Sequence, residues 1–371
     1  LRPKKLADVS ESPRFKKWGE LVTRKPWLSI TAGVLVMLVF ALPAADMRLG
    51  QPDDGNQPKN STERIAYDLT SKGFGAGFNG PFLIAVSLEQ ATSKSETKKD
   101  LTRLYYGLKK TPGVADVAPP SISPDKKLAT YTLIPKTSPQ DQQTSDLLNT
   151  IRKDVIPKSL EGSPLTAYVG GVTAGFDDFS DKVSEKLPLF ILLVIGMAVV
   201  LLMASFRSLW IPLVSALFNL LSVAAAYGVV VAVFQKGIGA ELLGIDPGVP
   251  IVSFIPVIMF AILFGLSMDY NVFLLSRVHE SYNEGDAPRD SVINGVSRIG
   301  KIVLFAGLIM ASVFMAFVLD PNVTSKMIGL GLGMAILIDV IFIRLIIAPA
   351  VVTLLGDKAW WLPKWLDKIL P

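Results

Sequence analysis

Residues 187–234 read LPLFILLVIGMAVVLLMASFRSLWIPLVSALFNLLSVAAAYGVVVAVF, two long apolar runs separated by a short segment that contains Arg207. A helix that crosses a bilayer needs roughly 20 mostly apolar residues, and the runs 187–204 and 209–234 are long enough. Four more such runs lie at 27–45, 247–268, 302–319 and 327–356. The sequence therefore predicts an α-helical polytopic membrane protein with six transmembrane helices.

The composition supports this class and excludes several others. Half of the 371 residues are hydrophobic, which exceeds what the core of a soluble domain needs. Cysteine is absent and His279 is the only histidine, so disulfides, Cys/His metal sites and Cys/His catalysis lack their residues. Paired catalytic acids and a nucleophile elbow are also missing from the pattern. We expect no enzyme activity, no metal and no cofactor.

Lysine and arginine in the short flanking segments gather on one side of the predicted helices. They are Arg14, Lys16, Lys17, Arg24, Lys25, Arg207, Arg277, Arg289, Arg298, Lys301, Lys358, Lys364 and Lys368. The connections 235–249 and 320–326, on the opposite side, carry one lysine each. The positive-inside rule then places both termini in the cytoplasm. It also explains the net charge of +5 without nucleic acid as a partner.

This topology divides the chain into five parts. Residues 1–26 are expected to form a cytoplasmic segment, 27–45 the first transmembrane helix and 46–186 an extracytoplasmic domain. Residues 187–356 carry helices two to six, and 357–371 a cytoplasmic interfacial segment. Tryptophans at the predicted membrane boundaries agree with these limits.

The extracytoplasmic domain alternates between strand and helix patterns. Strands are predicted at Phe82–Leu88, Val114–Val117, Leu128–Pro135 and Thr166–Val169, and helices at Ser93–Lys110 and Pro139–Pro157. The order β-α-β-β-α-β is that of α+β ferredoxin-like folds. Residues 172–186 then favour a polar helix that continues into the second transmembrane helix.

Gly75, Gly77 and Gly80 in the segment GFGAGFNG match the GxGxxG pattern of dinucleotide sites. That site requires a strand before the glycines and a helix after them. Here the predicted helix comes first and the strand follows. We therefore expect a helix C-cap and an irregular turn, with no nucleotide.

Asp269 is the most informative residue of the membrane segments. It lies in FGLSMDYNVFLLSR, residues 264–277, and a carboxylate at bilayer depth costs on the order of 2.5–3.5 kcal/mol. Such an acid is functional by default, and a nearby cation or hydroxyl would let it load and release a proton. Tyr270 is about 100° away around the helix and offers its phenol to a different neighbour. Gly265, one turn before Asp269, leaves room for another helix to approach.

Asp339 is a second intramembrane acid. Gly331 and Ala335 share its stripe, which favours close helix packing. Arg344 is predicted to lie on a different face and to extend toward the cytoplasmic boundary. Two roles stay open for Asp339: a structural group that caps a neighbouring helix break or pairs with Arg344 or Lys301, or a proton carrier.

Other polar residues are expected to be structural. Asn219 fits a hydrogen bond between helices, and His279 fits a solvated loop. The acids Asp177, Asp178 and Asp181 fit the exposed face of a helix.

Three segments resemble the MMPL (mycobacterial membrane protein large) family of the resistance-nodulation-division superfamily. They are FGLSMDYNVFLLSR, AILIDVIFIRLIIAPAVVTLLGDKAWWLPKWL at 335–366 and FGAGFNGPF at 74–82. The resemblance implies export of lipids or other hydrophobic molecules, driven by the proton gradient across a bacterial inner membrane, with the large domain as a periplasmic or extracellular porter domain. Asp269 and Tyr270 match the family's Asp-Tyr proton relay, and Asp339 matches an acid common in its last helix.

Members of this family usually carry two such halves, whereas this sequence has one and begins with Leu1. We therefore expect the C-terminal half of a longer transporter, whose partners are a lipid or hydrophobic substrate, protons and the second half. A half-length protein that works with another copy of itself is the alternative. Two further classes share the plan of one helix, a domain and five helices: a SecD/SecF-like translocation subunit, and a non-transporting lipid or sterol sensor.

Overall fold

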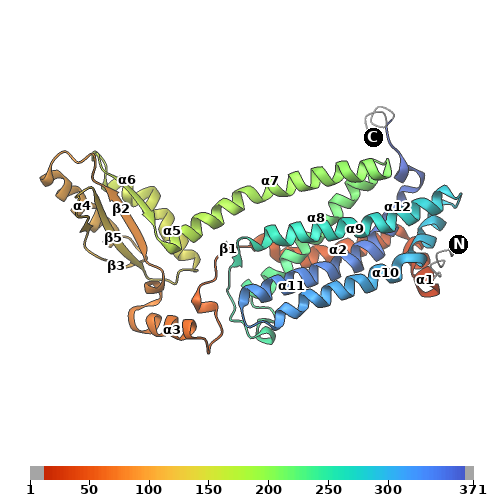
Figure 1. The fold of residues 1–371 in the computed structure, drawn as a ribbon, viewed down its shortest axis with the longest axis horizontal. Helices are drawn as coiled ribbons and strands as arrows, with labels where there is room; N and C mark the ends of the chain where they lie inside the picture. Colours follow the sequence, from red (N-terminus) through yellow and green to blue (C-terminus); the bar gives the residue numbers. More distant parts are fainter. Residues whose placement is uncertain (1–11, 364–371) are drawn as a thin grey trace, which may run out of the picture. The chain divides into compact units, whose positions relative to one another are not determined.

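The computed structural model describes residues 12–363, except the side chains of Asp269 and Tyr270. These residues belong to two compact units. Of the described residues, the helical unit comprises 12–47, 186–248 and 254–363, and the α/β unit comprises 48–185 and 249–253. Figure 1 gives the order of the elements along the chain.

Within residues 12–363, six helices are long and apolar enough to cross a membrane, so the protein is a multi-pass membrane protein of the predicted class. They are α2 (Pro26–Ala41) with η1 (Leu42–Asp46); α7 (Val172–Phe206); α8 (Trp210–Val230) with η5 (Val231–Gln235); α9 (Ile255–Asn283); α10 (Pro288–Ala316) with η7 (Phe317–Leu319); and α11 (Val323–Ile338) with η8 (Asp339–Ile347), α12 (Ala348–Leu355) and η9 (Gly356–Trp360). Another helix of the helical unit, α1 (Pro13–Arg24), precedes α2.

The fourth span differs from its prediction in both limits. Residues 247–254 are not helical, because Pro247, Gly248 and Pro250 disfavour helix there, and Ile251–Val252 form a short strand, β7. The helix begins at Ile255 and continues through polar residues to Asn283. Asp269 is thereby the central residue of α9.

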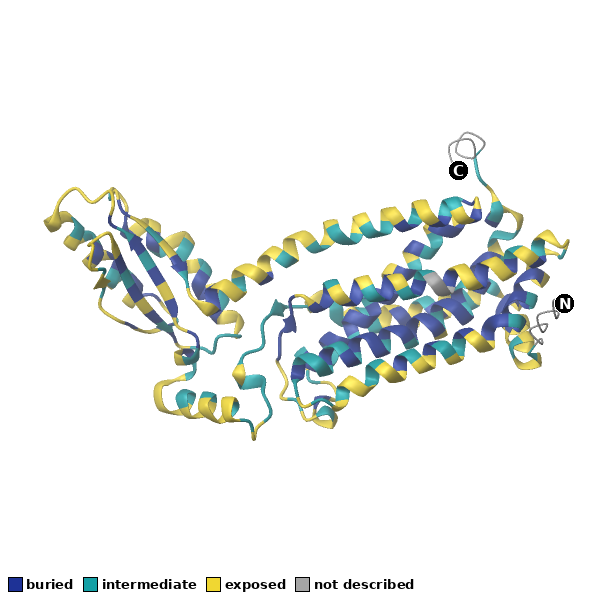
Figure 2. Ribbon diagram, viewed as in Figure 1, coloured by how far each residue is buried: buried dark blue, intermediate teal, exposed yellow. Residues whose placement is uncertain are grey.

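The last span is the most enclosed part of the helical unit, with 67% of its most apolar window buried (Figure 2). Its glycines explain how the neighbours come so close. A Cβ on Gly329 would lie 2.8 Å from the Phe314 carbonyl oxygen of α10, and one on Gly331 would lie 2.7 Å from Met259 Sδ of α9. The small-residue stripes predicted for this helix thus mark tight helix packing.

The α/β unit contains an antiparallel sheet of β2 (Phe82–Ser87), β3 (Val114–Val117), β5 (Leu128–Pro135) and β6 (Thr166–Gly170), in the order β3-β5-β2-β6. A two-residue strand, β4 (Ser121–Ile122), adds to β5. Helix α4 (Lys94–Lys109) and the segment α5 (Gln142–Thr150), η4 (Ile151–Val155) and α6 (Ile156–Ser159) pack on this sheet, with Leu104, Leu108 and Leu148 in the shared core.

The glycine-rich segment has the structure expected of a turn. Helix α3 (Thr62–Phe74) ends at Gly75, whose φ of 97° is the left-handed backbone that favours glycine, and η3 (Ala76–Asn79) follows. A Cβ on Gly77 would lie 1.9 Å from the Pro135 carbonyl oxygen. The glycine is needed for this close approach to β5.

A second, two-stranded sheet joins distant segments of the α/β unit. Strand β1 (Leu49–Gly50) pairs in parallel with β7, which lies about 200 residues later. Ser253 Oγ is 2.6 Å from Ser180 Oγ on α7 and donates to the Gly50 carbonyl oxygen at 3.1 Å. As predicted, residues 172–206 form one continuous helix, with Pro188 inside it.

Candidate functional site: a buried ion pair and the faces of α9

An ion pair lies inside the last transmembrane span. Arg344 Nε is 3.1 Å from Asp339 Oδ2, and the exposed fractions of the two side chains are 0% and 4%. Arg344 Nη2 also donates to Asp339 Oδ1 at 3.4 Å. Of the two structural partners that the sequence offers for Asp339, the structure selects Arg344, and Lys301 is exposed on α10.

The predicted position of Arg344 is wrong, and the backbone explains why. Five residues of an α-helix turn through about 500°, which would separate Asp339 and Arg344 by about 140°. Residues 339–347 instead form a π-helix, η8, in which hydrogen bonds join residues five apart. That ladder brings Arg344 back over Asp339, about one turn further along the helix. The guanidinium therefore reaches the carboxylate instead of extending to the membrane surface.

Two residues act at the C-terminal end of this π-helix: a proline that follows it and a tryptophan of another helix. Pro349 has no N–H, so it cannot donate an α-helical hydrogen bond to the carbonyl of Leu345. The indole Nε1 of Trp18, on α1, donates to that carbonyl at 2.8 Å. An unpaired carbonyl in this part of the protein would be costly, so Trp18 stabilises the irregular segment.

The ion pair is also connected to α9. Arg344 Nη2 donates to the carbonyl oxygen of Ser267, and the side chains of Ser267 and Asn271 are both buried. Arg344 Nη1 and Asn271 Nδ2 are buried donors without a hydrogen-bond partner among the described residues. The face of α9 with Ser267 and Asn271 therefore packs toward η8, and the site retains donors for a further acceptor. Sequence reasoning missed both residues.

The two other predicted site residues, Asp269 and Tyr270, occupy consecutive positions of α9, but their side chains lie outside the described part of the structure. Helical spacing places position 269 on the same face as Gly265 and Phe273, four residues before and after it. Phe273 is 65% exposed, and a Cβ on Gly265 would meet no described atom within 4 Å. The face of α9 that carries Gly265 and Phe273 is thus open among the described residues, and it is about 180° from the face that meets η8.

Two other polar residues differ from expectation. His279 lies within α9, not in a loop, and its ring stacks on Trp360 with 4.2 Å between ring centroids. Asn219 is buried in α8, yet its Oδ1 accepts no hydrogen bond from the described residues. Among those residues, no group of three His, Cys, Asp or Glu side chains could hold a metal ion.

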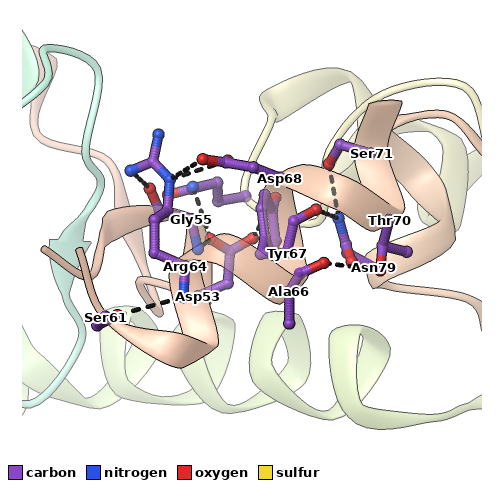
Figure 3. A network of polar contacts seen from close by, with 11 residues as sticks. Asp53, Gly55, Ser61, Arg64, Ala66, Tyr67, Asp68, Thr70, Ser71 and Asn79 are labelled. Atoms are coloured by element: carbon purple, nitrogen blue, oxygen red, sulfur yellow. Dashed lines mark hydrogen bonds and ion pairs between the residues drawn. The ribbon is translucent and has the colours of Figure 1, made fainter. Parts of the chain in front are cut away.

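A half-buried polar cluster lies in the α/β unit (Figure 3). Asp53 accepts hydrogen bonds from Tyr67 Oη at 2.8 Å, from Gln140 Nε2 at 2.9 Å and from the Gly55 amide at 2.9 Å. Burial raises the pKa of Asp53 above its ordinary value, and the hydrogen bonds from Tyr67 and Gly55 offset part of that rise. The cluster fastens the segment after β1 to α3 and to the loop before α5.

Comparison with known proteins gives a consistent result. Residues 57–368 match the MMPL family. The membrane protein YdfJ of Bacillus subtilis is 36% identical over 362 residues, and the mycolic acid-containing lipids exporter MmpL11 of Mycolicibacterium smegmatis is 34% identical over 367 residues. The trehalose monomycolate exporter MmpL3 of the same organism is 26% identical over 367 residues.

These matches cover 97%, 98% and 95% of this chain but only 49%, 38% and 35% of the respective relatives. The chain therefore spans about half the length, or less, of these relatives.

Proposed function

Because this chain belongs to the MMPL family, we propose that it is half of a transporter, the C-terminal half, which exports lipids or other hydrophobic molecules across a bacterial cell envelope and is driven by the proton-motive force. The observation that carries the proposal is the position of Asp269, an acid at the centre of a transmembrane helix, on a face that the described chain leaves open. Two relatives are named as lipid exporters, which supports the hydrophobic substrate.

The two intramembrane acids have different roles in this proposal. Asp339 is already paired with Arg344, and Arg344 also binds the backbone of α9, so this group fixes η8 against α9. Separating such a pair would leave a charge unpaired in the membrane interior, which is strongly unfavourable. Asp339 thus supports the relay by positioning α9, and Asp269 with Tyr270 carries the proton.

In this proposal, the second half of the transporter packs against the open face of α9. An aspartate and a tyrosine side by side in sequence project about 100° apart, so they contact different groups of a neighbouring helix. Gly265 lets that helix approach closely. Protonation of Asp269 removes the cost of its charge and permits a different packing of the two halves. Each elementary charge that crosses the membrane potential contributes about 2.3 kcal/mol per 100 mV, enough to bias a conformational change.

We assign the α/β unit to the porter domain on the periplasmic or extracellular side of the inner membrane, with both termini in the cytoplasm. Its sheet order and its two helical segments support a ferredoxin-like module. Helix α7 continues without interruption from this unit into the second transmembrane span. A change in the membrane is therefore transmitted to the porter domain through one helix.

The test uses the complete transporter, this chain together with its second half, in proteoliposomes with a fluorescent lipid and an imposed pH gradient. We expect export that disappears with a protonophore and in Asp269→Asn. Glu284→Gln, an exposed acid just after the end of α9, is the matched control and should export normally. Full gradient-dependent export by Asp269→Asn would refute the proposal.

A further inference from the structure

An apolar groove of about 250 Å³ lies between α1, α2 and η8 in the helical unit. It is separate from the face of α9 that bears Asp269. Its walls are formed mainly by Trp18, Leu21, Ala32, Val36, Phe342 and Ile346.

The polar groups around the groove are already bound to one another. Pro26 cannot donate to the carbonyl of Val22, and Ser29 Oγ donates to that carbonyl at 3.0 Å. Trp18 Nε1 is occupied in the same way by the Leu345 carbonyl. The groove therefore offers an occupant almost only hydrocarbon surface.

The groove is open, and its walls leave large apolar side chains exposed. Leu21 is 62% exposed, Val36 39% and Trp18 38%. Only 11% of the apolar window of α2 is buried, so α2 faces lipid along most of its length. A lipid chain is therefore the natural neighbour of these side chains in a membrane.

Cations surround one end of the groove. Lys17 is four residues before Leu21 and shares its face of α1, and Lys25 lies just after the helix, between the groove residues Leu21 and Ser29 in sequence. Both lysines are exposed. Helix α1 also carries Arg14, Lys16 and Arg24 against a single acid, Glu20. Basic residues close to a membrane surface attract anionic headgroups. Tryptophan side chains such as that of Trp18 are typically found at the level of the headgroups.

We propose that this groove binds one anionic phospholipid, with an acyl chain between α1, α2 and η8 and its phosphate on Lys17 and Lys25. The basic residues at the α1 end of the groove favour an anionic phospholipid over a purely apolar occupant. Phe342 and Ile346 of η8 line the groove, whereas Asp339 and Arg344 of the same π-helix bind each other and the backbone of α9. The bound lipid thus packs against the same irregular helix that holds the ion pair.

Native mass spectrometry of the purified protein, titrated with dioleoylphosphatidylglycerol or dioleoylphosphatidylcholine, tests this site. The wild type should retain one molecule of phosphatidylglycerol in preference to phosphatidylcholine. Lys17→Gln/Lys25→Gln should reduce phosphatidylglycerol affinity on the order of 25-fold and leave phosphatidylcholine unchanged, since each basic residue near the surface contributes about fivefold. Lys98→Gln/Lys99→Gln, with the same loss of charge on α4, should match the wild type.

A steric variant tests the acyl chain separately. Ala32→Phe fills the groove and should lower retention of both lipids, whereas Leu35→Phe, on the exposed side of α2, should not. Equal retention of the two lipids by the wild type would overturn the proposal, as would unchanged phosphatidylglycerol binding in Lys17→Gln/Lys25→Gln or in Ala32→Phe. A dimer that Ala32→Phe dissociates without any change in lipid retention would instead assign the groove to a second copy of the chain.

Discussion

The ion pair in η8 makes a quantitative prediction about stability. Arg344 is fully buried and Asp339 nearly so, and each is the other's charge partner at 3.1 Å. Removing one partner of a buried pair leaves an unpaired charge and typically costs about 3–5 kcal/mol, whereas replacing both with apolar residues is often neutral. We therefore expect Asp339→Leu and Arg344→Met each to lose about 3–5 kcal/mol of unfolding free energy. The double variant should lose much less than either.

Reversible unfolding in mixed micelles, analysed as a double-mutant cycle, measures this coupling. Arg344→Lys keeps the charge but loses the forked geometry that reaches both Asp339 and Ser267, so it should have intermediate stability. Lys301→Met is the control: Lys301 is exposed, and its substitution should change stability by less than about 0.5 kcal/mol. If the double variant lost the sum of the two single losses, about 6–10 kcal/mol, the pair would not be the unit that we describe.

Three other predictions each concern a single residue. Because burial raises the pKa of Asp53, the folded α/β unit binds its proton more readily than the unfolded chain, so this group destabilises the fold increasingly as pH rises from about 3.9 through the raised value. Asp53→Asn should remove that part of the pH dependence, which is measured by unfolding both proteins at pH values from acidic to neutral. A constant difference in unfolding free energy between the wild type and Asp53→Asn across that range would contradict the prediction. Gly77→Ala should cost roughly 1–3 kcal/mol in thermal or denaturant unfolding, because its Cβ would meet the Pro135 carbonyl oxygen at 1.9 Å; wild-type stability would contradict that close approach. Gly265→Leu should fold with wild-type stability, since no described atom lies within 4 Å of its Cβ, yet it should reduce export by keeping the second half away; normal export would refute the assignment of this face.

Much of the architecture follows from the hydropathy and turn patterns. All six spans were predicted to exist, and the four main strands were predicted near their observed positions. A long apolar run has few folded alternatives in a membrane, and alternating residues specify a strand. The glycine-rich turn was also predicted correctly. Its order of helix then strand excluded a phosphate loop, and Gly75 does end α3.

The ion pair was only partly predictable. The sequence offered Arg344 as a possible partner of Asp339, but a period of 3.6 residues placed the two on different faces. The π-helix that unites them depends on tertiary contacts, including that of Trp18 with Leu345, 327 residues apart. Pro349, shortly after the pair, is the one local signal that the regular ladder is interrupted.

The buried polar positions of α9 were missed for a similar reason. Ser267 and Asn271 flank the more conspicuous pair Asp269 and Tyr270, and hydropathy alone does not tell which face of a helix meets its neighbour. The non-helical segment that contains β7 was also unforeseen, because the apolar run 247–268 reads as continuous although Pro247, Gly248 and Pro250 interrupt the helix. The continuation of α9 through polar residues to Asn283 was unforeseen as well.

The central claim is that Asp269 couples proton movement to the movement of a hydrophobic substrate. Its most direct test is proton influx, followed with a trapped pH-sensitive dye in proteoliposomes of the complete transporter, before and after addition of lipid substrate. The account predicts lipid-dependent influx in the wild type and none in Asp269→Asn, at equal amounts of folded protein. Wild-type influx together with wild-type export in Asp269→Asn would contradict it.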